Sequence, residues 1–477
     1  MVLKGFTRRK RPYEVLSDEE IETVHRGTLE VLENTGVTFQ HRKALTILSD
    51  NGCRVDEHKQ RAHIPDYLVE ECIRKCPSSC VRRARDAKNN IRIGGNTLYF
   101  ATGCGMDTVD LDTWEIRIPT KQDQNNAVRV ADALENIHFI AFGPYLHFEG
   151  VNPLLTIPVA CASRIRNSTK AIMSESFQGS ERWNIRMAKM TGQELDGPVS
   201  ASSPLAFSKD SCNALFNFAD AGFSVHISSG TIYGGSGPAT LAGSMITSNA
   251  ELLAGMVLAQ LVKPGIGIMF LSFTHPLDMR WGIPIFGAIE KGIFTMMFNQ
   301  ICRNYRIPCY NSVGYSSSKV LDYQAGYEKA MQTLLCALSG ANLIDMVGSL
   351  YGELTYHPAI SVVDNDVCGM VGRILEGVEV TDETLGIDLI EDVGPVPGNY
   401  LSREHTRKWW KKEQFMPMVA DRLPYPEWIK KGKKNVLSNA KQKVKEILAT
   451  HIPTPLPKDQ DEGIEEILKE AGKCPRE

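Results

Sequence analysis

From Thr120 onward the sequence alternates between short apolar runs and longer amphipathic stretches, and this alternation constrains the fold more than any other feature. The apolar runs have the length and composition of buried β-strands: residues 137–142, 171–175, 199–202, 225–228, 266–270, 284–287, 308–313 and 343–347. Stretches of helical period lie among them: residues 152–167, 181–191, 210–221, 240–262, 289–305 and 322–339. Eight strands with interleaved helices predict an α/β fold, a TIM (β/α)₈ barrel. A doubly wound parallel sheet stays open, because one sequence does not give strand order.

The barrel pattern is flanked by segments of different character. Ser17 with Glu20 predicts the start of an N-terminal helix, and Gly36 predicts its end. Short β-rich runs then predict an antiparallel meander: residues 81–84, 91–93, 98–101 and 114–118. Prolines separate the helical stretches near the C-terminus: residues 403–414, 435–450 and 464–471. We therefore expect a helix and β-meander cap at 1–119, the barrel at 120–360, and a C-terminal helical extension at 361–477 that wraps the barrel.

Composition and charge exclude several classes of protein. The 477 residues are 43% hydrophobic and 23% charged, as in a folded globular chain, and the net charge of −3 provides no basic field for nucleic acid. The twelve cysteines are scattered from Cys53 to Cys474 without a dense framework, which is typical of reduced thiols in a cytoplasm. The basic N-terminus lacks a following apolar run, and the most apolar stretch, 259–273, is interrupted at Lys263. We expect a cytoplasmic protein with neither a nucleic-acid nor a membrane partner.

Two groups of residues invite a metal interpretation. Cys72, Cys76 and Cys80 are regularly spaced, but Pro77 breaks the run and no second ligand pair follows, so small buried side chains are the better interpretation. Three histidines follow predicted strands: His147, His275 and His357. Imidazoles at strand ends could hold a catalytic metal, which makes a metal-dependent lyase or hydrolase barrel an alternative. Acidic side chains are missing from the matching strand ends, so we expect no permanently bound metal.

Aromatic side chains follow most of the predicted strands. In a barrel, residues at the C-terminal strand ends form the active site, and rings with few lysines or arginines suit a cationic, apolar ligand. We predict an aromatic cage from six of these residues: Tyr145, Phe177, Tyr233, Tyr310, Tyr315 and Tyr351. Three polar neighbours are predicted to orient the ligand: His147, Glu175 and His357. No catalytic acid or base is assigned.

Several stretches carry a resemblance to a known family: residues 238–243, 250–261 with Pro264-Gly265, 321–329, 338–344, and 397–401 with His405-Thr406. Through these stretches, and over nearly its whole length, the chain resembles the trimethylamine methyltransferase family. The resemblance implies a TIM barrel that moves a methyl group from an amine to the cobalt of a separate corrinoid protein. The implied cofactor is therefore a Co(I) corrinoid, cobalamin, carried by a cognate partner protein.

Founding members of that family incorporate pyrrolysine in the barrel, and we place that position near residues 314–318, where this chain has only ordinary residues. The resemblance therefore points to the non-pyrrolysine branch and to a quaternary amine such as glycine betaine as substrate. A quaternary ammonium departs as a neutral tertiary amine, so an aromatic pocket without a general acid is sufficient. A non-catalytic amine-binding protein stays open beside the metal enzyme. The choice among betaines, the group that binds the substrate carboxylate and the oligomeric state, including a homo-oligomer, also stay open.

Overall fold

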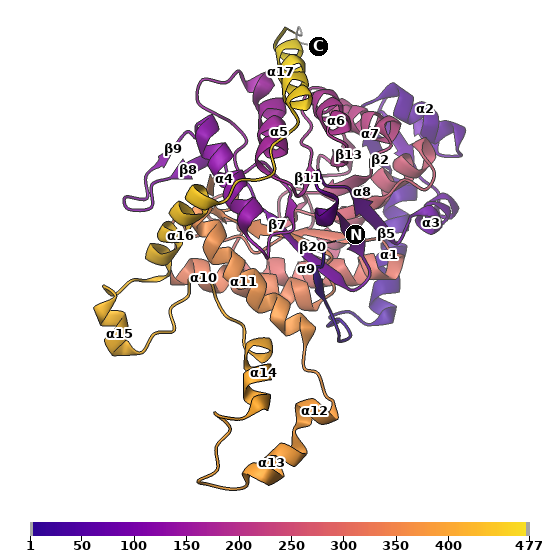
Figure 1. Cartoon of the computed structure of the whole chain (residues 1–477). Coiled ribbons are helices and arrows are strands. Elements are labelled where there is room, and N and C mark those ends of the chain that lie inside the picture. Colours follow the sequence, from indigo (N-terminus) through magenta and orange to yellow (C-terminus); the bar gives the residue numbers. More distant parts are fainter. Residues whose placement is uncertain (1–2, 474–477) are drawn as a thin grey trace.

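The computed structural model describes residues 3–473, and in that range eight parallel strands close into a barrel surrounded by helices (Figure 1). The barrel strands are, in order around the ring, β7 (Thr97–Thr102), β10 (Phe139–Ile140), β11 (Ala171–Met173), β12 (Leu195–Ser200), β14 (Val225–Ser229), β16 (Ile268–Ser272), β19 (Cys309–Ser312) and β20 (Leu343–Val347). The ring closes because β7 pairs with β10 on one side and with β20 on the other. The predicted (β/α)₈ barrel is confirmed.

One of the eight predicted strands is wrong, and another run takes its place. The run 284–287 overlaps only β18 (Ile283–Pro284), which pairs antiparallel with β17 (His275–Asp278) in a hairpin outside the barrel. The run 98–101, which we predicted to be part of the meander, lies in β7 and supplies the first barrel strand. Both runs are short and apolar, so only the pairing partners in the folded chain distinguish them.

Helices cover the outside of the barrel: α4 (Lys121–Ala133), α5 (Thr156–Asn167), α6 (Glu181–Met190), α7 (Lys209–Ala221), α8 (Leu241–Val262), α9 (Ile289–Tyr305), α10 (Tyr323–Leu338) and α11 (Pro358–Glu376). Side-chain caps start several of them, among them a capping box of Thr120 with Asp123 at α4. By length and composition α8 could cross a membrane, and it is the one such helix within residues 3–473. Most of its residues are buried against strands and neighbouring helices, so α8 is a core helix of the barrel.

The N-terminal segment covers one side and the N-terminal end of the barrel. It contains β1 (Phe6–Thr7), α1 (Asp18–Glu30), β2 (Val37–Phe39), α2 (Arg42–Asp50), β3 (Arg54–Asp56), β4 (Arg61–His63), α3 (Asp66–Lys75), β5 (Ser79–Arg82) and β6 (Ile91–Gly94). Side chains of the β5–β6 hairpin, including Cys80 and Ile93, join Tyr99, Phe139 and Leu343 in the cluster that fills the lower lumen. The hairpin therefore forms the floor of the barrel.

Two small sheets border the opposite end, where the barrel strands terminate. One contains β8 (Asp107–Val109), β9 (Ile116–Arg117), β21 (Ser349–Leu350) and β22 (Thr355–Tyr356), and the other contains β15 (Ile232–Tyr233), β17 and β18. Their strands lie in the loops that follow β7, β20, β14 and β16. The mouth of the barrel is therefore built from long, structured loops, which is where barrel enzymes hold their active sites.

The C-terminal extension has two parts. Its last helices, α16 (Val436–Thr450) and α17 (Lys458–Lys473), return to the barrel, where α16 packs on α11 and α4, and α17 packs on α6 and α5. Before them, α12 (Asp382–Leu385), α13 (Ile387–Val393) and α14 (Glu404–Glu413) project away from the barrel, and α15 (Tyr425–Lys430) lies in the connection to α16 (Figure 1). The last helices thus pack on the outside of the barrel, whereas α12 to α14 extend away from it (Figure 1).

Candidate functional site

Four rings gather at the mouth of the barrel, and we call them the mouth cluster: Phe273, His275, Phe286 and Tyr315. The ring centroids of Phe273 and His275 lie 4.7 Å apart, and those of His275 and Phe286 lie 4.5 Å apart. Tyr315 extends the cluster, with its centroid 6.0 Å from that of Phe286. Phe273 follows β16 and Tyr315 follows β19, so the cluster stands at two neighbouring C-terminal strand ends. Partly exposed Phe273 and Phe286 make it accessible from solvent.

His275 presents an acceptor lone pair within this cluster. Its Nδ1 lies 2.7 Å from the carbonyl oxygen of Phe273, and because a carbonyl only accepts, Nδ1 carries the hydrogen. Burial, with the nearby charge of Lys291, lowers the pKa of His275 well below its usual value, so the ring is neutral. Nε2 has no hydrogen-bond partner among residues 3–473. A neutral imidazole with a free lone pair beside three aromatic rings is an electron-rich environment suited to a cation.

Two carboxyl groups stand beside the mouth cluster. Asp345, in β20, accepts hydrogen bonds from the hydroxyls of Tyr310 at 2.5 Å and Ser312 at 3.0 Å, and burial raises its pKa well above the usual range. Glu353, in the loop after β20, lies next to Tyr315 and Cys104, and burial raises its pKa to about 7. The Tyr315 hydroxyl points toward Glu353 without a hydrogen bond of normal geometry to any described residue. These two acids therefore hold their protons far more readily than carboxyl groups in water.

A glycine allows Glu353 to approach the rings. Gly352 has a φ of +66°, and a Cβ built there would lie 2.6 Å from the Phe286 ring. A side chain at this position would therefore push the Glu353 loop away from the mouth cluster. Lys291, fully buried in α9, is the cation near both acids, and burial lowers its pKa to about 7. The site thus combines two acids with raised pKa and one lysine with lowered pKa, a pattern that is typical of functional sites.

Beneath the mouth, a polar chain runs through the lumen to the floor. Arg82 of β5 donates hydrogen bonds to Asp196 of β12, and Asp196 also lies 2.6 Å from Nδ1 of His226. The ring of His226 packs edge-on against Tyr310, with centroids 5.7 Å apart, and Tyr310 reaches Asp345. All five side chains are buried. The chain satisfies the polar groups of the lower lumen and holds Tyr310 under the mouth.

A sequence model of the trimethylamine methyltransferase family matches residues 1–471. The chain belongs to this family. Its members are methyltransferases, so membership makes this chain a methyltransferase and argues against a non-catalytic amine-binding protein.

Two relatives match this chain over nearly its whole length. The trimethylamine methyltransferase of Methanosarcina thermophila is 31% identical over 463 residues, which is 93% of this chain and 95% of the relative. The glycine betaine methyltransferase of Desulfitobacterium hafniense is 30% identical over 476 residues, 97% of this chain and 98% of the relative. Among solved structures, the monomethylamine methyltransferase of Methanosarcina barkeri matches with a TM-score of 0.57 and 14% identity, over 97% of this chain and 89% of that one. This last likeness supports the barrel fold.

Within this family fold, the six rings predicted to form a cage lie in different places. Tyr310 and Tyr315 lie in the lumen and at the mouth, as described above. Tyr145 packs on Tyr356 and donates to Thr108, and Tyr233 stacks on Phe294 in the outer core. Phe177 is largely exposed, and Tyr351 lies partly exposed under the Lys319 amine, 4.6 Å from its ring centroid. The structure brings two of the six near the mouth cluster and places the other four elsewhere.

The three predicted polar orienters have other partners. Glu175 forms a bidentate ion pair with buried Arg164 and accepts from the backbone N–H of Gly143. His147 lies 3.2 Å from Asp107 at the surface. His357 caps α11 through Nδ1, which accepts from the N–H of Ala359, and burial lowers its pKa to about 4. Their predicted contact with the ligand therefore has no support in this geometry.

Metal ligands do not converge in the described part of the chain, where no group of three or more His, Cys, Asp or Glu side chains could hold an ion. His275 packs in the mouth cluster while His147 and His357 have the separate partners given above. Cys72 lies in the core under α8, Cys76 donates to the Cys72 carbonyl, and Cys80 lies in the barrel floor. Cys474 lies outside the described residues.

The prediction missed Phe286, Asp345 and Glu353 as site residues. Phe286 lies within the run 284–287 that we placed in the barrel, and Asp345 lies inside a predicted strand rather than after it. Asp345 is two residues after Leu343, whose side chain fills the lumen, so both side chains point to the same face of the strand. A charged residue at that position was the available signal. Glu353 carries no such signal, because the loop conformation that brings it to Tyr315 depends on long-range packing.

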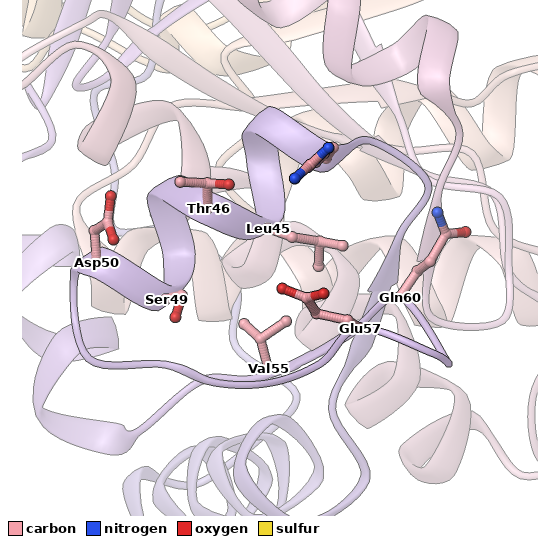
Figure 2. A pocket seen from close by; sticks show the side chains of 8 residues that line it. Leu45, Thr46, Ser49, Asp50, Val55, Glu57 and Gln60 are labelled. Atoms are coloured by element: carbon pink, nitrogen blue, oxygen red, sulfur yellow. The ribbon is translucent and has the colours of Figure 1, made fainter.

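A surface depression of about 410 Å³ lies on the N-terminal cap, between α2 and the β3–β4 hairpin (Figure 2). It is lined by Arg42, Leu45, Thr46, Ser49, Asp50, Val55, Glu57 and Gln60. None of these residues belongs to a barrel strand or to a loop at the mouth. The depression therefore contributes nothing to the site at the mouth.

Proposed function

We propose that this chain transfers a methyl group from a quaternary amine to the Co(I) of a cognate corrinoid protein, and that glycine betaine is the substrate. The observation that carries the proposal is the mouth cluster, in which aromatic faces and the free lone pair of His275 meet at the C-terminal strand ends. Cation–π contacts of about 0.5–2 kcal/mol per ring would hold a trimethylammonium group there. The named activity of the D. hafniense relative supports the choice of substrate class.

The chemistry of a quaternary amine requires no general acid. The C–N bond breaks with its electron pair remaining on nitrogen, so glycine betaine leaves as neutral-nitrogen dimethylglycine and needs no proton. The corrinoid Co(I), a second substrate in this reaction, supplies the electron pair for the new bond to carbon. The chain has to bind, orient and exclude water, because a cation out of water is destabilised relative to a transition state with less charge on nitrogen.

Individual residues have distinct tasks in this proposal. Phe273, Phe286 and Tyr315 surround the methylated nitrogen, and His275 directs its lone pair toward the positive charge. The Tyr315 hydroxyl, which has no well-formed hydrogen bond within residues 3–473, is our choice as donor to the substrate carboxylate. Burial raises the pKa of Asp345 well above its usual value and that of Glu353 to about 7, so the two acids place less negative charge against that carboxylate than ordinary carboxylates would.

The sequence supports a quaternary rather than a tertiary amine. Residues 314–318 read Gly-Tyr-Ser-Ser-Ser and include Tyr315 of the mouth cluster. An ordinary aromatic residue therefore stands in the segment where we place the pyrrolysine of the founding members. A ring at this place binds a preformed cation. Trimethylamine without an added proton would instead have to release dimethylamide, a much poorer leaving group than the neutral tertiary amine that a quaternary ammonium releases.

The test is a methyl-transfer screen with purified protein and reduced cob(I)alamin, followed by the absorbance change to methylcobalamin. Glycine betaine, other betaines, carnitine, choline and trimethylamine are compared at equal concentration. We expect turnover with glycine betaine and none with trimethylamine. Equal or faster turnover of trimethylamine would reject the proposal.

A further inference from the structure

Residues 377–414 form an arm that leaves the barrel and returns to the same helix. The chain departs from the end of α11 at Gly377, and after α14 Phe415 packs on Gly369 of α11. The N–H groups of Met418, Val419 and Ala420 then donate to the Asp366 carboxylate, also in α11. The arm is therefore fastened at both ends, and Figure 1 shows α12, α13 and α14 projecting from the body.

The arm has no core of its own. Every residue from 377 to 414 is described, and none of them is buried. Apolar side chains are instead exposed along its whole length: Val378, Val380, Leu385, Ile387, Ile390, Val396, Tyr400, Leu401 and Trp410. So many exposed apolar side chains on a segment without a core favour an interaction site over a solvated face.

The charges of the arm are separated into two halves. Residues 378–393 contain six acidic and no basic side chains, and residues 403–412 contain five basic and one acidic. Two ion pairs join the halves within one chain, Lys408 with Glu383 and Arg403 with Asp392. Asp388 and Glu391 in one half, and Lys411 and Lys412 in the other, make no ion pair with any residue from 3 to 473.

We propose that the arm docks against the arm of a second copy of this chain and forms a two-fold dimer. A two-fold axis places the acidic α12–α13 of one copy against the basic α14 of the other, twice, so the surface is complementary to itself. The exposed apolar residues of both halves are buried in the same contact. A stable dimer needs about 20–30 residues on each side, which an arm of this length provides.

Sedimentation velocity of the full-length protein at about 20 μM tests the proposal. We expect a mass near twice 52.9 kDa for the wild type. The variant Ile387→Asp/Ile390→Asp changes side chains that are 56% and 54% exposed, so the fold tolerates it, and the melting temperature checks this. Because each substitution acts twice, we expect the dimer dissociation constant to rise by about a hundredfold or more.

Matched controls separate the arm contact from a general effect of acidic substitution. Ile452→Asp, at a side chain that is 76% exposed between α16 and α17, should leave the dimer intact. Two charge-reversal variants should each weaken the dimer: Asp388→Lys with Glu391→Lys, and Lys411→Glu with Lys412→Glu. A chain that carries all four changes should dimerise again, because the two halves are then complementary with exchanged signs. A monomeric wild type, or a paired isoleucine variant with the wild-type mass, overturns the proposal. If the arm binds a different protein instead of a second copy, the wild type is monomeric, and the proposal is overturned in that case too.

Discussion

Tyr310 donates its hydroxyl hydrogen to Oδ2 of Asp345 at 2.5 Å, and Ser312 donates to the same oxygen. The other oxygen, Oδ1, has no hydrogen-bond partner within residues 3–473. Burial raises the pKa of Asp345 well above its usual range. One oxygen of this carboxyl is thus held by two hydroxyls of the barrel wall, and the other has no such partner.

Replacing Asp345 tests this arrangement. A carboxyl whose pKa is raised in the folded state stabilises the folded protein fully only below its pKa in the unfolded state, which is near 4. This stabilisation is lost as pH rises through the pKa of the folded state. We therefore expect Asp345→Asn, which keeps an acceptor for Tyr310, to be at least as stable as the wild type at pH 8. Asp345→Ala leaves the Tyr310 hydroxyl buried without a partner and should cost about 1–3 kcal/mol. Urea unfolding of both variants measures the difference; an alanine variant as stable as the asparagine variant would contradict it.

Leucine substitutions separate binding rings from packing rings. Phe286→Leu and Tyr315→Leu remove a π face from the mouth cluster but keep much of the apolar volume, and should lower kcat/KM for the best quaternary amine about five- to thirtyfold. Tyr145→Leu removes hydroxyl contacts to Thr108 and the Tyr356 carbonyl in a closed core. We expect that change to lower the melting temperature with little effect on kcat/KM. Steady-state kinetics together with thermal unfolding distinguish the two groups.

The same series examines three further rings of the sequence-predicted cage. Phe177→Leu, Tyr233→Leu and Tyr351→Leu should keep kcat/KM within about twofold of the wild type, since these rings lie outside the mouth cluster. A loss of tenfold or more at any of them would return that ring to the substrate site.

The raised pKa of Glu353 predicts that the stability of the folded protein depends on pH. Burial raises its pKa from 4.5 to about 7, so the folded protein prefers the protonated form. The stabilisation by the bound proton is complete below about pH 4.5 and is lost as pH rises through 7. Relative to Glu353→Gln, the wild type should therefore lose several degrees of melting temperature between pH 5 and pH 8. A constant difference between the two proteins over this range would show that Glu353 keeps an ordinary pKa.

Metal content provides an independent check on the methyl-transfer proposal. Because His147, His275 and His357 have separate partners, we expect less than about 0.1 equivalent of zinc or iron per chain by elemental analysis. EDTA should leave methyl transfer to added cob(I)alamin unchanged. A stoichiometric metal whose removal abolishes activity would instead favour a metal-dependent barrel enzyme.

Much of the local structure follows from the sequence. The capping boxes at Ser17 and Thr120 start helices where predicted, and the stretch 240–262 is the long helix α8. These features depend on side chains a few residues apart, so a single sequence contains the information they need. The alternation of strands and helices likewise predicted the barrel, and motifs along the chain indicated the methyltransferase family.

Tertiary structure alone decided which run closes the barrel and which rings meet at its mouth. Runs 98–101 and 284–287 have similar local character, and the pairing of β7 with both β10 and β20 chooses between them. Tyr145 and Tyr315 both follow barrel strands, yet one turns into a closed core and the other toward Phe286. Such orientations depend on contacts between residues far apart in the chain. The free energies of these contacts cannot be derived from the local sequence. The sequence by itself therefore determined the architecture and the family, and long-range packing determined the site.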